Sequence, residues 1–330
     1  MAETKDSILR TSRDAWPEME RFRIEVLAGL RKPQKEVPSK YLYDEKGSQL
    51  FEMICTLDEY YIPSSEAVLM ERHINEVVEL IGPNAFILEY GSGNCRKVCF
   101  LLDHLHDPVA YAPIDISREQ LSQASGRLIR NYPWLEVLPV CADYTCRFEL
   151  PVPKRRCCRH LVYFPGSTIS NFDPRSIERF LEQVAGVCGP GGGLLIGVDL
   201  KKDPVILHQA YNDRRGVTAD FNLNLLERIN RELGGNFKPH FFRHYAFYHP
   251  GESRVEMHLI STKEQMVHLG DEVIPFSRGE SIWTESSYKF NLDDFARLAD
   301  TSGFRVEKVW TDEQQWFSIQ YLTTTKDKPA

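Results

Sequence analysis

The chain has 330 residues, of which 42% are hydrophobic and 26% are charged, and this composition excludes a disordered, collagen-like or low-complexity protein. Its 40 Lys and Arg residues against 47 Asp and Glu residues give a net charge of −7, without a long basic run. We therefore expect no nucleic-acid partner. At roughly 150 residues per domain, the length predicts two domains, or one large domain with an insertion.

The sequence carries no signal for a membrane or for export. No apolar run approaches the ~18–20 residues of a membrane span, and the first residues, MAETKDSILRTSRDAW, lack the apolar core of a secretory signal. We expect a cytoplasmic protein with no membrane partner. The cysteines form no paired C-x-x-C sets and the histidines no H-E-x-x-H motif, so we expect reduced thiols and no metal.

The middle of the chain alternates short apolar runs with helical patterns, which is typical of a parallel sheet wrapped by helices. The five predicted strands are Ala85–Tyr90, Ala110–Asp115, Leu135–Tyr144, His160–Ser167 and Gly192–Leu200. The three predicted helices between them are 96–105, 117–132 and 173–187. These elements predict an α/β fold with a doubly wound sheet.

The alternation stops after Leu200. A polar helix pattern (220–233) is followed by aromatic-rich alternating segments at 242–249 and 254–262, which favour an antiparallel sheet. A helix at 292–304 and two closing strands at 304–313 and 316–325 then resume the α/β pattern.

Two discontinuous domains follow from this pattern. Residues 62–200 with 287–330 are predicted to form the cofactor domain. Residues 1–61 with 201–286 are predicted to form a smaller α+β substrate domain. Because both domains are self-contained, we expect a monomer.

The first loop after a central strand holds the expected cofactor residues, because ligands of doubly wound sheets bind beyond the carboxyl ends of the strands. The loop Glu89-Tyr90-Gly91-Ser92-Gly93 has two glycines that permit close ligand approach. A dinucleotide fingerprint would need a third glycine at 96, where Arg96 stands. NAD and FAD are therefore disfavoured.

The next two strand ends indicate a nucleoside. Asp115 lies 22 residues after Gly93 and could accept hydrogen bonds from both ribose hydroxyls, and Asp143 with Tyr144 could hold an adenine. No phosphate-binding group is needed. With Gly91, Ser92 and Gly93 these ends describe an S-adenosylmethionine pocket typical of class I methyltransferases, and Lys97 could pair with the carboxylate of that cofactor.

Several other segments carry a resemblance to a known family. They are YLYDEKGSQLFEMI, LDEYYIPSSEAVL, LEYGSGNCRKV, FPGSTISNFDP, AYNDRRGVTADFNLN and WTESSYKF. From about Pro38 to Gln320 the chain resembles the histidine Nα-methyltransferases of ergothioneine biosynthesis. The resemblance implies a Rossmann-like class I methyltransferase that transfers three methyl groups from S-adenosylmethionine to free L-histidine, giving hercynine. The family also holds enzymes that methylate dimethylallyltryptophan.

The resemblance also implies an acceptor site. Asn171 and Tyr211 would hold the substrate carboxylate, with Gly166 in the same site. Glu285 and Ser287 match the imidazole-recognition positions, and an acid with a hydroxyl suits a ring with two nitrogens. An indole could use only one of these two partners, so histidine is favoured over a tryptophan-derived amine.

Aromatic side chains suit an amine that becomes a permanent cation. Tyr43, Phe51 and Tyr60 match substrate-site segments, and ring faces attract alkylated ammonium by roughly 0.5–2 kcal/mol. Met257 matches a position near the acceptor ring, where core filling is an equally good interpretation. Tyr43 is our candidate catalytic residue, accepting or relaying the departing proton through water.

Three other functions stay open at this point. The nearest is a methyltransferase for a tryptophan-derived amine. A methyltransferase for RNA or protein is disfavoured by the acidic chain without a basic, aromatic-interleaved stripe. A cofactor-binding regulator without activity would need a broken acceptor site, whereas this one looks complete.

Overall fold

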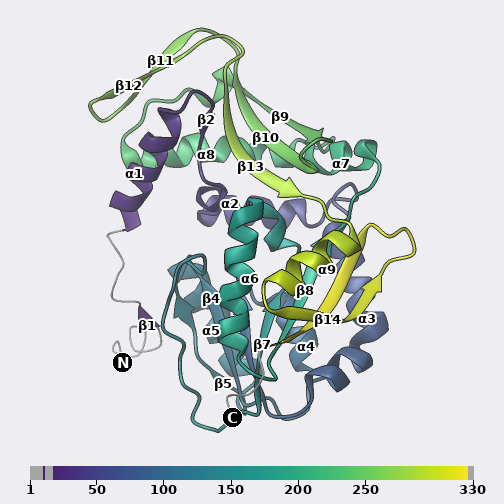
Figure 1. The fold of residues 1–330 in the computed structure, drawn as a ribbon. Coiled ribbons are helices and arrows are strands. Elements are labelled where there is room, and N and C mark those ends of the chain that lie inside the picture. Colours follow the sequence, from purple (N-terminus) through teal and green to yellow (C-terminus); the bar gives the residue numbers. More distant parts are fainter. Residues whose placement is uncertain (1–9, 12–17, 326–330) are drawn as a thin grey trace. The chain divides into compact units, whose positions relative to one another are not determined.

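The computed structural model describes residues 10–11 and 18–325, which fall into two compact units. The larger unit holds residues 10–11, 62–201 and 290–325, and the smaller holds 18–61 and 202–289. Figure 1 shows the helices and strands of both. Each unit is built from segments that are far apart in the sequence.

A nine-stranded sheet forms the larger unit, in the order β1-β6-β4-β3-β7-β8-β15-β14, with β5 paired to β4. Strands β1 to β8 of this sheet run parallel, whereas β15 is antiparallel to both β8 and β14. The strands are β1 (Arg10–Thr11), β3 (Ala85–Tyr90), β4 (Ala110–Asp115), β5 (Glu136–Val137), β6 (Val140–Cys141), β7 (Arg159–Phe164), β8 (Gly193–Asp199), β14 (Phe304–Thr311) and β15 (Phe317–Thr324). This topology confirms the predicted Rossmann-like doubly wound sheet.

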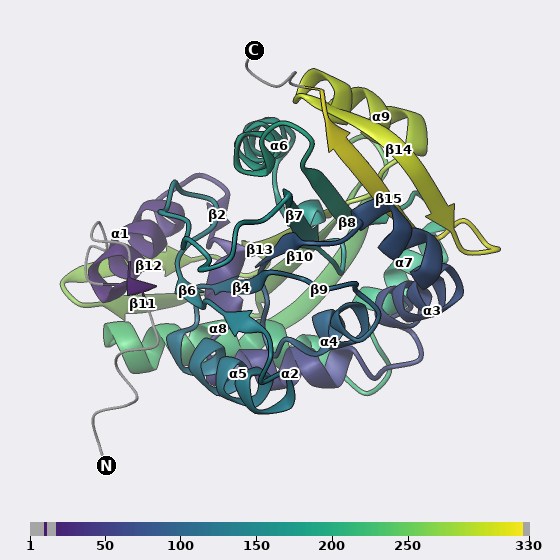
Figure 2. The same cartoon turned by 90° about the horizontal axis from the view of Figure 1, so that it is seen from below.

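Helices cover both faces of this sheet (Figure 2). On one face lie α6 (Pro174–Cys188) and α9 (Leu292–Thr301), and on the other lie α3 (Ile62–Ile81), α4 (Arg96–Leu102) and α5 (Arg118–Asn131). Leu88, Val162 and Ile196 of the sheet pack in one buried cluster with Leu181 and Phe295 of the helices. Burying these apolar side chains supplies the main stabilisation of the unit.

The third predicted strand, Leu135–Tyr144, is wrong as a single element. The structure has the short strands β5 and β6 instead, separated by Leu138 and Pro139. Proline has no N–H to donate to a strand ladder, which accounts for the break. Asp143 and Tyr144 consequently lie in the turn after β6 rather than at a strand end.

The smaller unit combines helices with a four-stranded sheet in the order β2-β13-β10-β9, in which β13, β10 and β9 are antiparallel. Its strands are β2 (Lys35–Glu36), β9 (Phe242–His249), β10 (Arg254–Ser261) and β13 (Ser281–Tyr288), and a separate hairpin holds β11 (Gln265–Leu269) and β12 (Glu272–Phe276). Its helices are α1 (Glu18–Leu30), α2 (Glu45–Ile54), α7 (Pro204–Tyr211) and α8 (Val217–Leu233), with 3-10 turns at Ser39–Leu42 and Pro239–Phe241. The predicted antiparallel sheet is confirmed.

Two predicted boundaries differ from the structure. Residues 1–61 were expected to join the insertion, but Arg10 and Thr11 pair in parallel with Val140 and Cys141 of the large sheet. A cut at 287 would fall inside β13, whose pairing with β10 continues through Tyr288. The assignment of one unit to the cofactor and the other to the substrate stays a prediction.

All eight cysteines are free thiols. Among residues 10–11 and 18–325, no helix combines the length and the apolar character that crossing a membrane requires. The same residues contain no group of three or more His, Cys, Asp or Glu side chains placed to hold a metal ion.

Candidate active site

The glycine loop after β3 needs glycine for its backbone conformation. Gly91 and Gly93 have φ angles of 67° and 51°, in the left-handed region that other residues rarely adopt. The loop is tied to the end of β4, because the N–H groups of Gly91 and Ser92 donate to the carbonyl of Ile114 at 2.9 and 3.2 Å. Backbone groups therefore fix this loop beside the carboxyl end of the next strand.

Asp115, the last residue of β4, closes the glycine loop. Its carboxylate accepts hydrogen bonds from the backbone N–H of Gly93 and of Ser117, both at 2.9 Å. Burial raises the pKa of Asp115, although bonds from the N–H groups of Ser117 and Gly93 act in the opposite direction. The carboxylate of Asp115 is thus held at the loop where a ribose is expected.

Asp143 and Tyr144 lie close to Asp115 and the loop. An added Cβ on Gly91 would meet the Tyr144 ring at 3.6 Å. Burial raises the pKa of the Tyr144 phenol, as do the nearby carboxylates of Asp115 and Asp143. The structure therefore brings the predicted adenosyl residues of three successive loops together.

Lys97, on the helix after the loop, forms an ion pair that the sequence did not suggest. Its Nζ lies 2.6 Å from Oε2 of Glu66, a buried residue of α3. The other oxygen, Oε1 of Glu66, accepts the backbone N–H of Gly166 at 2.7 Å. Glu66 therefore joins the helix after β3 to the turn after β7, and the predicted pairing of Lys97 with a cofactor carboxylate stays a prediction.

A second buried acid stands at the end of β3. The carboxylate of Glu89 accepts a hydrogen bond from the hydroxyl of Tyr111 on β4. Burial raises the pKa of Glu89 to about 8, while the Tyr111 hydrogen bond and the charge of Lys97 lower it. The pKa of Glu89 therefore depends on the charges near the glycine loop, and a positive charge there lowers it.

Gly166 and Asn171 lie on the segment that follows β7. Gly166 has a φ of 76°, and Asn171 ends the 3-10 turn Thr168–Asn171. Asp173, rather than Asn171, caps α6, since its side chain accepts the N–H groups of Arg175 and Ser176. The side chain of Asn171 is therefore not needed for capping this helix.

In the smaller unit, the predicted aromatic residues form one cluster. Ring centroids of Tyr43 and Phe51 lie 5.4 Å apart, those of Phe51 and Tyr60 6.3 Å apart, and those of Tyr60 and Tyr211 6.2 Å apart, each pair edge-to-face. Phe221 of α8 packs against Tyr43 and Phe51 at 5.4 and 6.0 Å. Ring faces and edges are thus gathered from three parts of the chain, namely residues 43–60, α7 and α8.

Glu285 lies next to this cluster on β13. It is directly opposite Met257 of β10, so the two side chains share one face of the sheet. Glu285 is 9% exposed, and its Oε2 has no hydrogen-bond partner among the residues that the structure describes. Burial raises the pKa of Glu285 to about 7, against the effect of the Lys289 charge.

Ser287 follows two residues later and therefore points to the same face of β13 as Glu285. Its Oγ accepts the hydroxyl of Tyr211 at 2.7 Å and the ammonium of Lys289 at 2.7 Å. Lys289 also donates to the Tyr211 oxygen at 3.0 Å. Three side chains from α7 and the end of β13 thus close a ring of hydrogen bonds.

Each unit therefore assembles its own share of the predicted residues. The larger unit groups Gly91, Ser92, Gly93, Asp115, Asp143 and Tyr144 at the carboxyl ends of its parallel strands. Lys97 and Gly166 are joined there through Glu66. The smaller unit groups Tyr43, Phe51, Tyr60, Tyr211, Met257, Glu285 and Ser287.

Two residues of these networks escaped the sequence reasoning. Lys289 had a usable signal, because positions 285, 287 and 289 alternate along one face of an extended segment. Glu66 had none, because it lies on a helix 100 residues before Gly166.

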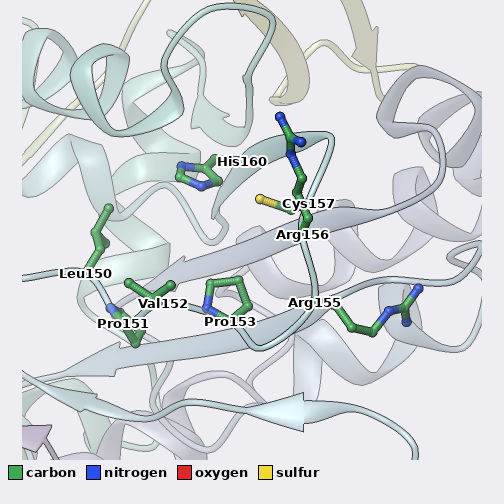
Figure 3. A pocket seen from close by; sticks show the side chains of 8 residues that line it. All are labelled: Leu150, Pro151, Val152, Pro153, Arg155, Arg156, Cys157 and His160. Atoms are coloured by element: carbon green, nitrogen blue, oxygen red, sulfur yellow. The ribbon is translucent and has the colours of Figure 1, made fainter.

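A separate pocket of about 320 Å³ lies away from these residues. Its lining consists of Leu150, Pro151, Val152, Pro153, Arg155, Arg156, Cys157 and His160 (Figure 3). His160 stands near the amino end of β7, the opposite end from the glycine loop. Arg155 extends away from the apolar side chains and binds Asp107 at 2.6 Å, so this pocket contributes nothing to the site above.

Comparisons with known proteins place the chain in a family. A family model for histidine-specific, S-adenosylmethionine-dependent methyltransferases matches residues 22–324. The chain is 37% identical over 304 residues to a histidine N-alpha-methyltransferase of Mycobacterium tuberculosis, which covers 90% of this chain and 93% of that protein.

Two further relatives are fungal. Ergothioneine biosynthesis protein 1 of Neurospora crassa is 32% identical over 299 residues, 84% of this chain and 32% of that longer protein. A 4-dimethylallyltryptophan N-methyltransferase of Claviceps purpurea is 25% identical over 315 residues, 88% of this chain and 91% of that protein. As its motifs predicted, the chain belongs to the S-adenosylmethionine-dependent, histidine-specific methyltransferase family.

Proposed function

We propose that this protein transfers methyl groups from S-adenosylmethionine to the α-amino nitrogen of free L-histidine, giving the trimethyl betaine hercynine for ergothioneine biosynthesis. Family membership supports this activity. The observation that carries the choice of acceptor is the buried Glu285, whose Oε2 has no partner among the described residues and which shares a strand face with Ser287.

The residues around the glycine loop fit a nucleoside cofactor held without phosphate. The positive φ angles of Gly91 and Gly93 let the backbone approach a ligand, and the carboxylate of Asp115 is held for ribose hydroxyls. Asp143 and Tyr144 would hold the adenine, and Lys97 the carboxylate of the amino-acid end. When bound, S-adenosylmethionine supplies an electrophilic methyl group.

The acceptor residues must align the amine of the substrate with the methyl group that is transferred. Methyl transfer is an in-line displacement by a lone pair, so the amine must be uncharged and correctly oriented, and orientation can supply on the order of 7–11 kcal/mol. Asn171 and Tyr211 would hold the substrate carboxylate, and Gly166 is expected to belong to the acceptor site. Glu285 and Ser287 would hold the imidazole, with Met257 as a wall.

The aromatic cluster suits the growing methylated amine. Tyr43, Phe51 and Tyr60 present rings that attract an alkylated ammonium more strongly as it loses water. Tyr43 would accept or relay the proton that leaves the amine at each transfer. We further expect the protein to act in the cytosol as a monomer.

The direct test is mass spectrometry after incubation of the pure protein with L-histidine and S-adenosylmethionine at neutral to mildly alkaline pH. We expect products heavier than histidine by one, two and three methyl groups, with the trimethyl product accumulating. The absence of all three would refute the proposed activity. A competition between L-histidine and dimethylallyltryptophan measures acceptor choice, and faster turnover of the indole substrate would reassign the protein to that activity.

A further inference from the structure

Lys289 is a buried cation in the acceptor half of the molecule, with no part in the function proposed above. Its side chain is 2% exposed, although lysine is almost never fully buried without a partner. Two of its hydrogen bonds go to hydroxyl groups, Ser287 Oγ at 2.7 Å and the Tyr211 oxygen at 3.0 Å. Its Nζ also lies 5.0 Å from the centre of the Tyr211 ring.

These bonds determine what Ser287 can still do. A serine hydroxyl has one hydrogen to donate and two lone pairs that accept. The oxygen of Ser287 accepts from Lys289 and also from the hydroxyl of Tyr211, each at 2.7 Å. The ammonium of Lys289 can only donate, so it keeps one lone pair of Ser287 occupied even when the hydroxyl of Tyr211 turns to the substrate carboxylate. It thereby turns the hydrogen of Ser287 away from itself and toward a ligand.

Glu285 offers the opposite chemistry on the same face of β13. An ionised carboxylate only accepts hydrogen bonds, and Oε2 of this one is buried without a partner among the described residues. Glu285 lies near Tyr60 and Tyr211, since burial, Tyr211 and Glu285 each raise the pKa of the Tyr60 phenol. The face therefore presents one acceptor and one donor.

We propose that Lys289 is a positioning residue that fixes Ser287 as a hydrogen-bond donor, so that this site selects the uncharged imidazole ring. This inference rests on the proposed function. A neutral imidazole carries one N–H and one nitrogen lone pair, which match Glu285 and Ser287 respectively. An indole or a pyrrole has only the N–H, and an imidazolium has two, so each leaves the Ser287 hydroxyl without an acceptor.

The test compares L-histidine with the two isomers of β-pyrrolyl-L-alanine, in which one ring nitrogen is kept as N–H and the other is replaced by C–H. Dissociation constants are measured by calorimetry with S-adenosylhomocysteine present. The readout is the ratio of the constant for the better-binding pyrrole isomer to that for histidine. General loss of folding lowers both affinities together and does not move this ratio.

The wild-type protein should favour histidine by about 30-fold, the cost of leaving one buried donor, the Ser287 hydroxyl, unpaired. Lys289→Met should lower this preference about tenfold, because Ser287 is then free to turn its hydrogen elsewhere. Lys289→Gln, which keeps an N–H donor, should retain most of it. Lys46→Met is the matched control, since Lys46 is an exposed lysine of the same unit paired with Glu227.

A double-mutant cycle identifies the route of the effect. If Lys289 acts through Ser287, Ser287→Ala alone should lower the preference as far as Lys289→Met does, and the double variant should lower it no further. An unchanged ratio in Lys289→Met, or multiplicative losses in the double variant, would overturn the inference. If Lys289→Met does not fold, Ser287→Ala decides alone, and a retained preference for histidine refutes the donor role.

Failure of the underlying function looks different. A wild-type protein that neither binds nor methylates L-histidine contradicts the proposed activity itself. A wild-type protein that methylates L-histidine, with the same ratio in every variant, contradicts only the role of Lys289.

Discussion

The glycine-loop region of the larger unit and the β13 region of the smaller unit hold their polar groups in different ways. Around the loop, backbone groups do the holding: Asp115 is fixed by the N–H groups of Gly93 and Ser117. At β13, side chains hold one another, as Lys289, Tyr211 and Ser287 do.

This difference teaches what each region requires of a sequence. A site made by backbone groups needs only glycines and one acid at the ends of strands, so many sequences can build it. A site made by side chains changes its chemistry with each substitution. We therefore expect changes at β13 to alter which acceptor is used, and changes at the loop to alter cofactor binding alone.

The largest effect should come from Glu285→Ala. A hydrogen bond to a charged group is worth about 1.5–3 kcal/mol, so the KM for L-histidine should rise roughly 100-fold. The dissociation constant for S-adenosylhomocysteine, measured by calorimetry, should stay within about twofold. Ser286→Ala is the control, because Ser286 pairs with Glu256 on the opposite face of the strand. Equal losses for histidine and cofactor would show that Glu285 is structural.

Asp115→Ala should have the reverse pattern. The change removes the acceptor that closes the glycine loop, and we expect cofactor affinity to fall about 30-fold by calorimetry. Asp300→Ala, at an exposed acid of α9 in the same unit, should leave that affinity unchanged. If Asp115→Ala binds S-adenosylhomocysteine as the wild type does, the proposed ribose contact is wrong.

Glu285 should also leave a signature in stability against pH. Its pKa is raised from 4.5 to about 7 by burial, so the folded state holds the proton more tightly than the unfolded state. The stability from this group is present below pH 4.5 and is lost as the pH rises to about 7. Glu285→Gln does not titrate, so at pH 8 it should be about 3 kcal/mol more stable than the wild type.

Urea unfolding at pH 4.5 and at pH 8 measures this difference. We expect the gap between Glu285→Gln and the wild type to open only at the higher pH. A gap of the same size at both values would mean that the carboxylate is not destabilised by its burial.

The smallest effect should come from Tyr43→Phe. The ring contacts with Phe51 and Phe221 survive this change, so thermal stability should hold while the rate of trimethylation falls about fivefold through loss of the proton relay. Initial rates against pH provide the measurement. If the rate and its pH dependence both stay as in the wild type, Tyr43 has no role in proton handling.

The sequence predicted the larger unit best. The predicted ranges Ala85–Tyr90 and Ala110–Asp115 coincide with β3 and β4, because fully buried parallel strands have continuous apolar runs that end at polar residues. The strand interrupted by Pro139 was overestimated in length, since its flanking residues kept the apolar pattern. The hairpin of β11 and β12 was missed. Its exposed face carries the apolar residues Met266 and Val273, which obscure the alternation of apolar and polar residues that marks a half-buried strand.

The acceptor residues were predictable only through the family resemblance. Nothing in the spacing of Tyr43, Tyr211 and Glu285 relates them to one another, because contacts between distant segments depend on how helices and strands pack. Glu66 illustrates the limit, since its two bonds join it to residues 31 and 100 positions away. Lys289 lies within the motif TESSYKF, but its proposed positioning role is indicated only by its burial and its hydrogen bonds in the structure.

The pairing of β2 with β13 has a consequence for synthesis on the ribosome. Lys35 and Glu36 align with Ile282 and Trp283, some 247 residues later. The strand β2 therefore cannot pair until β13 has been synthesised. The larger sheet likewise needs β15 between β8 and β14. The sheet of the smaller unit therefore stays incomplete until β13 has emerged from the ribosome, and that of the larger unit until β15 has emerged, and we expect each incomplete sheet to expose apolar surface until then.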